Sequence, residues 1–313
     1  MKTIACILLY ISSLLCIADP QSLNADTVAL LNGLGDAYKK HNFQGRFVFD
    51  AGDKKHSLEI LHGWRDGLEY ERLQQIGGSG ARIVRVGDFV SCQLPAGKEA
   101  LPQANVTVDF VMPFADQSAI DLQYYRTVIV GEAKVAGRPA IEVQLLPLDQ
   151  HRLAYHFWID TEFGLLLRLY TLSNEGGNQL EMFEFVSLDI LSDIQRAAFA
   201  LDSTLPVRRM HAKTIEDESM AMPMFQSAWL PPGFVLTDIK HWQASDGRAE
   251  TLMYSDSVTA ITTFVEPVDS LHNLQSTRFS QGATVALDRK MTLNNQHWLV
   301  TVIGEVPMQT AHK

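Results

Sequence analysis

The stretch from Thr127 to Leu188 constrains the fold most, because apolar and polar residues alternate along nearly all of it. The alternation runs through segments such as TVIVGEAKV, AIEVQLL, LAYHFWID and LLLRLYTL, which are separated by short turns. Side chains two positions apart lie on the same face of a strand, so Leu153, Phe157 and Ile159 share a face. We therefore predict an antiparallel meander that must bury one apolar face, by curling or by packing against another element.

The chain before the meander predicts one helix and four strands. Asp26 can cap a helix through TVALLNGLGDAYKKH, in which Val28, Leu31 and Leu34 form an apolar stripe. The strands are FQGRFVFD, SLEILHGW, RIVRV and FVSCQL, and an irregular segment from Pro95 to Leu122 follows them. Together with the meander, this predicts an eight-stranded sheet with a single helix in a first domain over residues 26–192.

The composition changes after residue 192, where charges and methionines mix without strand alternation. We interpret residues 193–224 as an interdomain linker and residues 225–313 as a second domain. The second domain begins with WLPPGF and continues with five strand-like segments, FVLTDIKHW, AETLMYSD, AITTFVEP, ATVALD and HWLVTVIGEVP. Pro307 would begin a terminal helix close to the last residue. The fold class is therefore α+β, mainly antiparallel β, in two domains.

The first 25 residues are typical of a secretory signal peptide, with Lys2 before an apolar run from Ile4 to Ile17. Cleavage after Ala18 and cleavage after Ala25 both remain open. We expect an exported, soluble protein, because no later segment approaches the roughly 20 apolar residues of a membrane span. The net charge of −10, with scattered basic residues, argues against a nucleic-acid partner.

The search for catalytic chemistry finds no candidate. The GGSGA loop around Ser79 is one residue short of a nucleophile elbow, and a strand rather than a helix follows it. His62 with Asp66, Glu69 and Glu71 is the nearest acid/base cluster, but alternation favours a hydrogen-bonded His62 inside the sheet and a solvated turn for DGLEYERL. The sequence has no metal-ligand spacing and no cofactor motif, and its lone mature cysteine, Cys92, predicts a small buried apolar residue.

Aromatic residues are concentrated on the predicted sheet faces. Each one alone is most simply a core residue, but an eight-stranded sheet with one helix has more apolar surface than the helix can cover. We therefore predict a concave apolar cavity for a lipid or an amphipathic peptide. The candidate lining residues are Phe47, Phe49, Trp64, Phe89, Tyr155, Phe157 and Phe185.

Several stretches together resemble the RseB/MucB family of periplasmic regulators. They are HNFQGRFVFD, DGLEYERLQQIGG with RIVRVGD, the segment YYRTVIVGEAKVAGRPAIEVQLLPLDQHRLAYHFWIDTEFGLLLRLYTL, and WLPPGF with HWLVTVIGEVP. They occur in the family's order and cover nearly the whole mature chain. The resemblance implies a LolA-like open half-barrel followed by a smaller α/β domain. It is weakest in the irregular segment from Pro95 to Leu122.

The resemblance also implies a function without catalysis. Family members bind the periplasmic segment of a membrane anti-sigma factor, RseA or MucA, shield it from site-1 proteolysis, and release it in response to lipid or lipopolysaccharide. The expected location is the periplasm, and a homodimer would suit the family. Two alternatives remain from the residues themselves: a lipid or lipoprotein carrier, suggested by the cavity, and an exported hydrolase, suggested by the Ser79 loop and His62.

Overall fold

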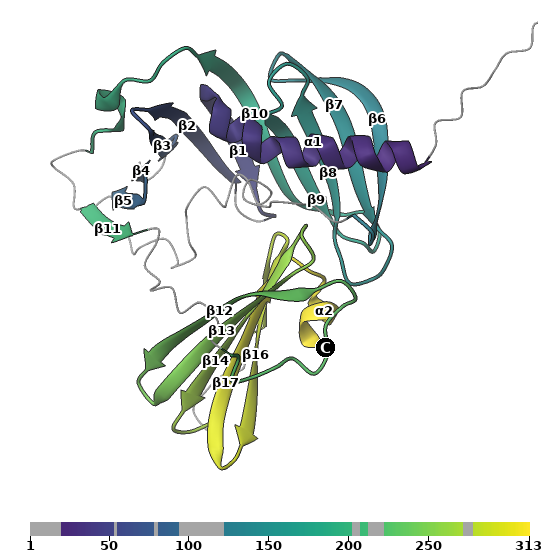
Figure 1. Cartoon of the computed structure of the whole chain (residues 1–313), viewed down its shortest axis with the longest axis vertical. Helices are drawn as coiled ribbons and strands as arrows, with labels where there is room; N and C mark the ends of the chain where they lie inside the picture. Colours follow the sequence, from purple (N-terminus) through teal and green to yellow (C-terminus); the bar gives the residue numbers. More distant parts are fainter. Residues whose placement is uncertain are drawn as a thin grey trace, which may run out of the picture.

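The chain forms two antiparallel sheets, a larger one drawn above a smaller one in Figure 1. The computed structural model describes residues 20–52, 55–77, 81–93, 122–201, 207–211, 222–271 and 278–313. Most of the expected signal peptide, Ser79, and nearly all of the irregular segment from Pro95 to Leu122 lie outside these residues. So does much of the second half of the expected linker.

The larger sheet has eleven strands in the order β11-β5-β4-β3-β2-β1-β10-β9-β8-β7-β6. The predicted meander is confirmed as the last five of the order, with Phe157 of β8 paired to Val143 of β7 and to Leu169 of β9. The bounds are β1 (Asn42–Asp50), β2 (Lys55–Arg65), β3 (Leu68–Gln75), β4 (Arg82–Val86), β5 (Phe89–Gln93), β6 (Tyr125–Val135), β7 (Arg138–Pro147), β8 (Ala154–Asp160), β9 (Leu166–Leu172), β10 (Gln179–Leu191) and β11 (Val207–His211).

The expectation of eight strands was too low, and the solvated turn expected at DGLEYERL was wrong. Residues Leu68–Gln75 form β3, which pairs with β2 and with β4. The carboxylates that suggested a turn can lie in a strand because the fold pairs them: buried Glu71 accepts a hydrogen bond from Tyr38, and Glu69 from His62. Polarity alone therefore misplaced this strand.

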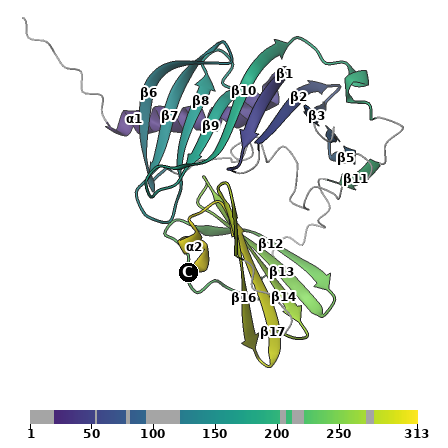
Figure 2. The same cartoon turned by 180° about the vertical axis from the view of Figure 1, so that it is seen from behind.

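Helix α1 (Pro20–Lys40) lies across one face of the larger sheet, in front of the strands in Figure 1 and behind them in Figure 2. It begins six residues before the Asp26 cap that we predicted, so a cut after Ala25 would fall inside it. Leu31 and Leu34 are fully buried against the core that also contains Phe157. The sheet thus curves around one helix without closing, which confirms the predicted open half-barrel.

The strand order explains why a long connection joins β5 to β6. Strand β5 is next to one edge and β6 forms the other, nine strand spacings away. At about 4.8 Å per spacing this is roughly 40 Å along a flat sheet. The 31 residues between Gln93 and Tyr125 can extend to about 100 Å, so their number comfortably allows the crossing.

The first part of the expected linker packs on the larger sheet instead of leaving it. A 3₁₀ turn, η2 (Arg196–Phe199), places Phe199 against Tyr70, on the face of β2–β4 that α1 does not cover. Arg72 donates to the carbonyl of Ala198 over 2.6 Å. Further along the expected linker, β11 pairs with β5 at the sheet edge.

The smaller sheet has six strands in the order β12-β13-β14-β17-β16-β15, one more than predicted. The additional strand, β15, is only four residues long and lacks a clear alternation. No helix within the described residues is long and apolar enough to cross a membrane. The bounds are β12 (Val235–Ala244), β13 (Gly247–Ser255), β14 (Ala260–Val268), β15 (Arg278–Gln281), β16 (Thr284–Leu293), β17 (Gln296–Gly304) and α2 (Met308–His312).

Candidate functional site

The structure divides the seven predicted cavity residues into two groups. Five of them are buried in the core beneath α1, namely Phe47, Phe49, Tyr155, Phe157 and Phe185. The remaining two, Trp64 and Phe89, are 38% and 60% exposed and do not join that core cluster. Contact of these seven side chains with a ligand stays a prediction.

The buried aromatic residues pack against one another, edge to face or tilted. The ring centroids of Phe47 and Phe185 are 5.7 Å apart at 69°, and those of Phe183 and Phe185 are 5.1 Å apart at 82°. These are favourable geometries for aromatic pairs. In this conformation the rings stabilise the half-barrel, so a ligand entering here would have to displace packed side chains or α1.

A buried polar cluster attaches the end of α1 to the sheet. His62 is fully buried and contacts the His41 carbonyl at 3.1 Å and Oε1 of Glu69 at 3.0 Å, while Arg85 donates to Glu69 over 3.0 Å. Burial alone would raise the pKa of Glu69, but the hydrogen bond from His62 and the charge of Arg85 lower it below its ordinary value.

Burial also raises the pKa of Glu71, and this effect is larger than the opposing effects of the Arg85 charge and of the hydrogen bond from Tyr38. The same burial, together with the charge of Glu71, raises the pKa of the Tyr38 hydroxyl. His62 therefore hydrogen-bonds inside the sheet, as predicted, and its polar partners come from the helix end and the neighbouring strand. The predicted cluster member Asp66 instead lies in the β2–β3 turn, where Arg196 binds it.

The two sheets meet through a buried arginine that sequence reasoning missed. Arg152 precedes β8 and is fully buried; its Nε donates to Oδ2 of Asp256, in the second domain, over 2.6 Å. Its other nitrogens donate to Asp149 and to the carbonyl of Pro232. The guanidinium also lies 4.3 Å from the centre of the Tyr124 ring. We call Arg152, Asp149, Asp256 and Pro232 the arginine clasp.

A second contact joins β10 to the turn between β15 and β16. The backbone N–H of Ala283 donates to Oε1 of Glu181 over 3.0 Å. Gly282 has φ +59°, and a Cβ built there would be 2.3 Å from the same oxygen, so only glycine allows this approach. Ala283 and Val258 are buried within the core cluster of the larger sheet, so the two domains share apolar packing.

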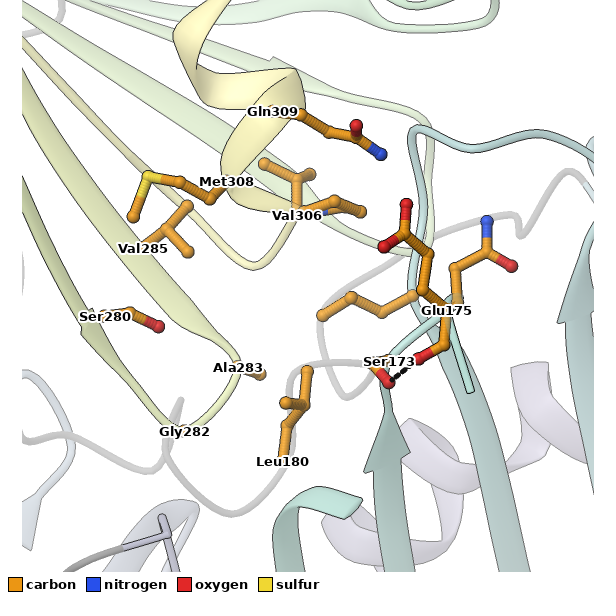
Figure 3. Close-up of a pocket in the computed structure, with 13 residues that line it drawn as sticks. Ser173, Glu175, Leu180, Ser280, Gly282, Ala283, Val285, Val306, Met308 and Gln309 are labelled. Carbon is orange, nitrogen blue, oxygen red and sulfur yellow. Dashed lines mark hydrogen bonds between the residues drawn. The ribbon is translucent and has the colours of Figure 1, made fainter. Parts of the chain in front are cut away.

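A cavity of about 320 Å³ lies beside this turn, between the two domains. Figure 3 shows Leu180 at the bottom, the turn at Gly282 and Ala283 to its left, and above them Val306, which follows β17, and Met308 at the start of α2. Ser173, Glu175 and Gln309 form the polar rim. The cavity suits an apolar group with a polar end.

Helix α2 and the chain end complete the joint. Nδ1 of His151 is 3.2 Å from Oγ1 of Thr310, and its ring lies edge-on to Trp229 at 5.1 Å. Lys313 places its ammonium 4.3 Å from the centre of the same Trp229 ring. The last helix therefore contributes to the domain interface despite its length of five residues.

Sequence patterns could not identify the interface residues, because Arg152, Glu181 and Ala283 fall in turns and at strand ends. The signals that exist are local: Pro-Pro-Gly before β12 and the single glycine between β15 and β16. Within the described parts of the chain, no group of three or more His, Cys, Asp or Glu side chains is placed to hold a metal ion. Cys92 forms no disulfide within the described residues and is partly buried against the core.

Comparison with known proteins follows the same two-domain division. Residues 26–202 match the model of the MucB/RseB N-terminal domain, and residues 220–313 match that of the MucB/RseB C-terminal domain. The fold and these matches define a two-domain regulatory binding protein rather than an enzyme. The chain belongs to the MucB/RseB family.

Relatives match along almost the whole chain. The sigma factor AlgU regulatory protein MucB of Pseudomonas aeruginosa is 31% identical, over 98% of this chain and 94% of its own length. The sigma-E factor regulatory protein RseB of Escherichia coli is 23% identical, over 91% and 88%. A solved complex of MucA and MucB from Pseudomonas aeruginosa matches with a TM-score of 0.69 and 27% identity, over 92% of this chain and 96% of that one.

Proposed function

We propose that this chain binds the periplasmic segment of a membrane anti-sigma factor of the RseA/MucA type and shields it from site-1 proteolysis. It would thereby repress the envelope stress response from the periplasm. The observation that carries the proposal is the match across both domains to MucB, including a MucB solved together with MucA. A partner that needs both domains would explain why their interface is fixed by buried polar and apolar contacts.

Lipid or lipopolysaccharide would release the anti-sigma factor by favouring a conformation that binds it less well. Two features of the fold support an amphipathic signal. One is the aromatic core beneath α1, which is reachable if the helix moves. The other is the interdomain cavity, which has apolar walls and a polar rim.

The direct test measures binding and protection together. The mature chain is mixed with the periplasmic segment of the source cell's own anti-sigma factor, and the segment's cleavage by the site-1 protease is followed. We expect a stable complex and slower cleavage, and we expect lipopolysaccharide to restore cleavage. Size-exclusion chromatography of the same samples reports whether a homodimer forms. Absence of binding together with unchanged cleavage would refute the proposal.

A lipid or lipoprotein carrier is the second candidate, and the open half-barrel favours it. The buried joint to a second domain argues against it, because a carrier cavity needs no such partner. Transfer of labelled acyl chains from the purified protein to acceptor vesicles, without any effect on anti-sigma-factor cleavage, would favour the carrier instead.

A further inference from the structure

The contact between β10 and the β15–β16 turn contains a carboxylate where the two domains close on each other. Glu181 receives the N–H of Ala283 at 3.0 Å, and the missing side chain of Gly282 lets the turn lie directly on the carboxylate. Ala283 itself is 1% exposed. Separation of the domains would break this hydrogen bond and expose both groups to water.

A second carboxylate, Glu305, follows β17 and acts on Glu181 through its charge. Burial and the charge of Glu305 raise the pKa of Glu181 to about 7, against the opposing effect of the Ala283 hydrogen bond. Burial likewise raises the pKa of Glu305. Burial is the largest cause of both shifts, and the charge of Glu305 adds to the shift of Glu181.

Other charged and titratable groups of the joint belong to neighbouring contacts. Tyr155 is close enough to Glu181, Glu305 and Asp256 for their charges to raise its pKa, after the larger effect of burial, and it stays neutral near pH 7. Arg152 is held by Asp256 and Asp149 in the arginine clasp.

His151 acts in the opposite sense to Glu181. Burial and the charges of Lys313 and Arg152 lower its pKa, with Asp149 opposing them, so protonation of His151 in acid weakens the closed joint.

We propose that Glu181, with Gly282, Ala283 and Glu305, forms a pH-sensitive interdomain latch that holds the domains together when Glu181 is protonated and weakens when it ionises. The latch concerns the free protein and is independent of the proposed anti-sigma partner. It would make the separation of the domains depend on the acidity outside the cell membrane.

The sign and size of the effect follow from proton linkage. Glu181 binds a proton more tightly in the closed joint, so the closed form is most favoured below its ordinary pKa of 4.5 and loses stability as pH rises to about 7. For these two values, the closed-to-open ratio falls about 40-fold between pH 5 and pH 7 and only about twofold more by pH 8.5. The dependence therefore lies in the mildly acidic range.

Hydrogen exchange of the Ala283 amide measures the closed-to-open ratio directly, after correction for the intrinsic exchange rate at each pH. The informative quantity is the protection factor of the unmodified protein divided by that of Glu181→Gln, because His151 contributes equally to both. Glutamine keeps an oxygen acceptor for Ala283 but cannot ionise. Glu175→Gln is the matched control, since this exposed carboxylate lies on the rim of the same cavity.

We expect this ratio to fall by tens-fold between pH 5 and pH 7, and the control to behave like the unmodified protein. Glu305→Gln should reduce the dependence without abolishing it. The amide of Val143, in the core of the larger sheet, reports global unfolding. A ratio that stays constant with pH, or a parallel loss of protection at Val143, would overturn the latch. If Glu181→Gln fails to fold, the Ala283 protection factor is measured in His151→Asn, which removes the opposing titration, and a pH-independent factor in that variant would overturn the latch equally.

Discussion

Replacing Arg152 by alanine is the most informative perturbation of the domain joint. The guanidinium is fully buried, and the Asp256 side chain that it binds is 1% exposed. The substitution removes the cation and leaves this carboxylate without its charged partner. Oδ1 of Asp256 would still accept the N–H groups of Val258 and Thr259, at 3.0 and 2.9 Å.

The expected loss is large because an unpaired buried charge remains. Removing one partner of a buried ion pair costs about 3–5 kcal/mol, against a total folding stability of about 5–15 kcal/mol for a typical protein. The loss should fall on the second domain and on the joint, since Asp256 and Pro232 both belong to the second domain. The core beneath α1 should be affected least.

Urea unfolding followed by tryptophan fluorescence measures the loss, and hydrogen exchange of the Ala283 amide monitors separation of the domains. Arg46→Ala is the control, because the Arg46 side chain is 66% exposed and pairs with Glu59 at the surface, with 3.5 Å between Nε and Oε2. We expect this substitution to lower the free energy of unfolding by less than about 1 kcal/mol. A loss below about 1 kcal/mol in Arg152→Ala would refute the reasoning.

A double variant separates charge from packing. Arg152→Met with Asp256→Asn removes both charges while it keeps the oxygen that caps the turn. It should recover part of the stability lost in Arg152→Ala, because a matched neutral pair avoids the cost of a buried lone carboxylate. If the double variant recovers no stability, the loss in Arg152→Ala comes mainly from the hydrogen bonds of Arg152 rather than from the unpaired charge.

Two further substitutions test packing. Gly233→Ala places a Cβ 2.0 Å from the Tyr124 ring, whereas at Gly137, which has a similar positive φ, an added Cβ meets nothing within 4 Å. We therefore expect Gly233→Ala to lower the midpoint temperature of thermal unfolding clearly more than Gly137→Ala does. Equal shifts of the two midpoints would contradict the close approach. Phe157→Asp replaces a fully buried ring and should lower the free energy of unfolding by at least about 3–5 kcal/mol, so that circular dichroism detects little folded protein. Phe89→Asp replaces a ring that is 60% exposed and should lower the free energy of unfolding by less than about 1 kcal/mol. A folded, stable Phe157→Asp variant would show that this ring is not part of the core.

The sequence predicted the meander from Thr127 to Leu188 well, because alternation along most of its strands, short turns and buried aromatic residues agree there, and the observed strands run from Tyr125 to Leu191. It failed at β3, where Glu69 and Glu71 point to a turn unless their partners Tyr38, His62 and Arg85 are known. Tyr38 lies 33 residues from Glu71 and Arg85 lies 16 residues from Glu69, whereas His62 is only seven residues from Glu69, so no single local pattern contains all three partners. Local propensity is overridden wherever tertiary pairing satisfies a polar group.

The site was less predictable than the fold for a related reason. Aromatic residues at strand spacing predict a buried face correctly, but they do not show whether a helix or a ligand covers it, and α1 does so here. The domain joint depends on Arg152 and Glu181, whose partners Asp256 and Ala283 are about 100 residues further along the chain. Single residues at strand ends have no period from which such pairings could be recognised.

The pairing of β11 with β5 affects how the first domain can be separated from the second. Val207 to His211 come from the connection between the domains, yet they supply the last strand of the larger sheet. A fragment ending at residue 192 would keep the pairing of β5 with β4 but leave unpaired the N–H and C=O groups of β5 that face β11, along an open edge beside the exposed Phe89. Such an edge can pair with another copy, so the first domain would be expected to self-associate unless its fragment extends through His211.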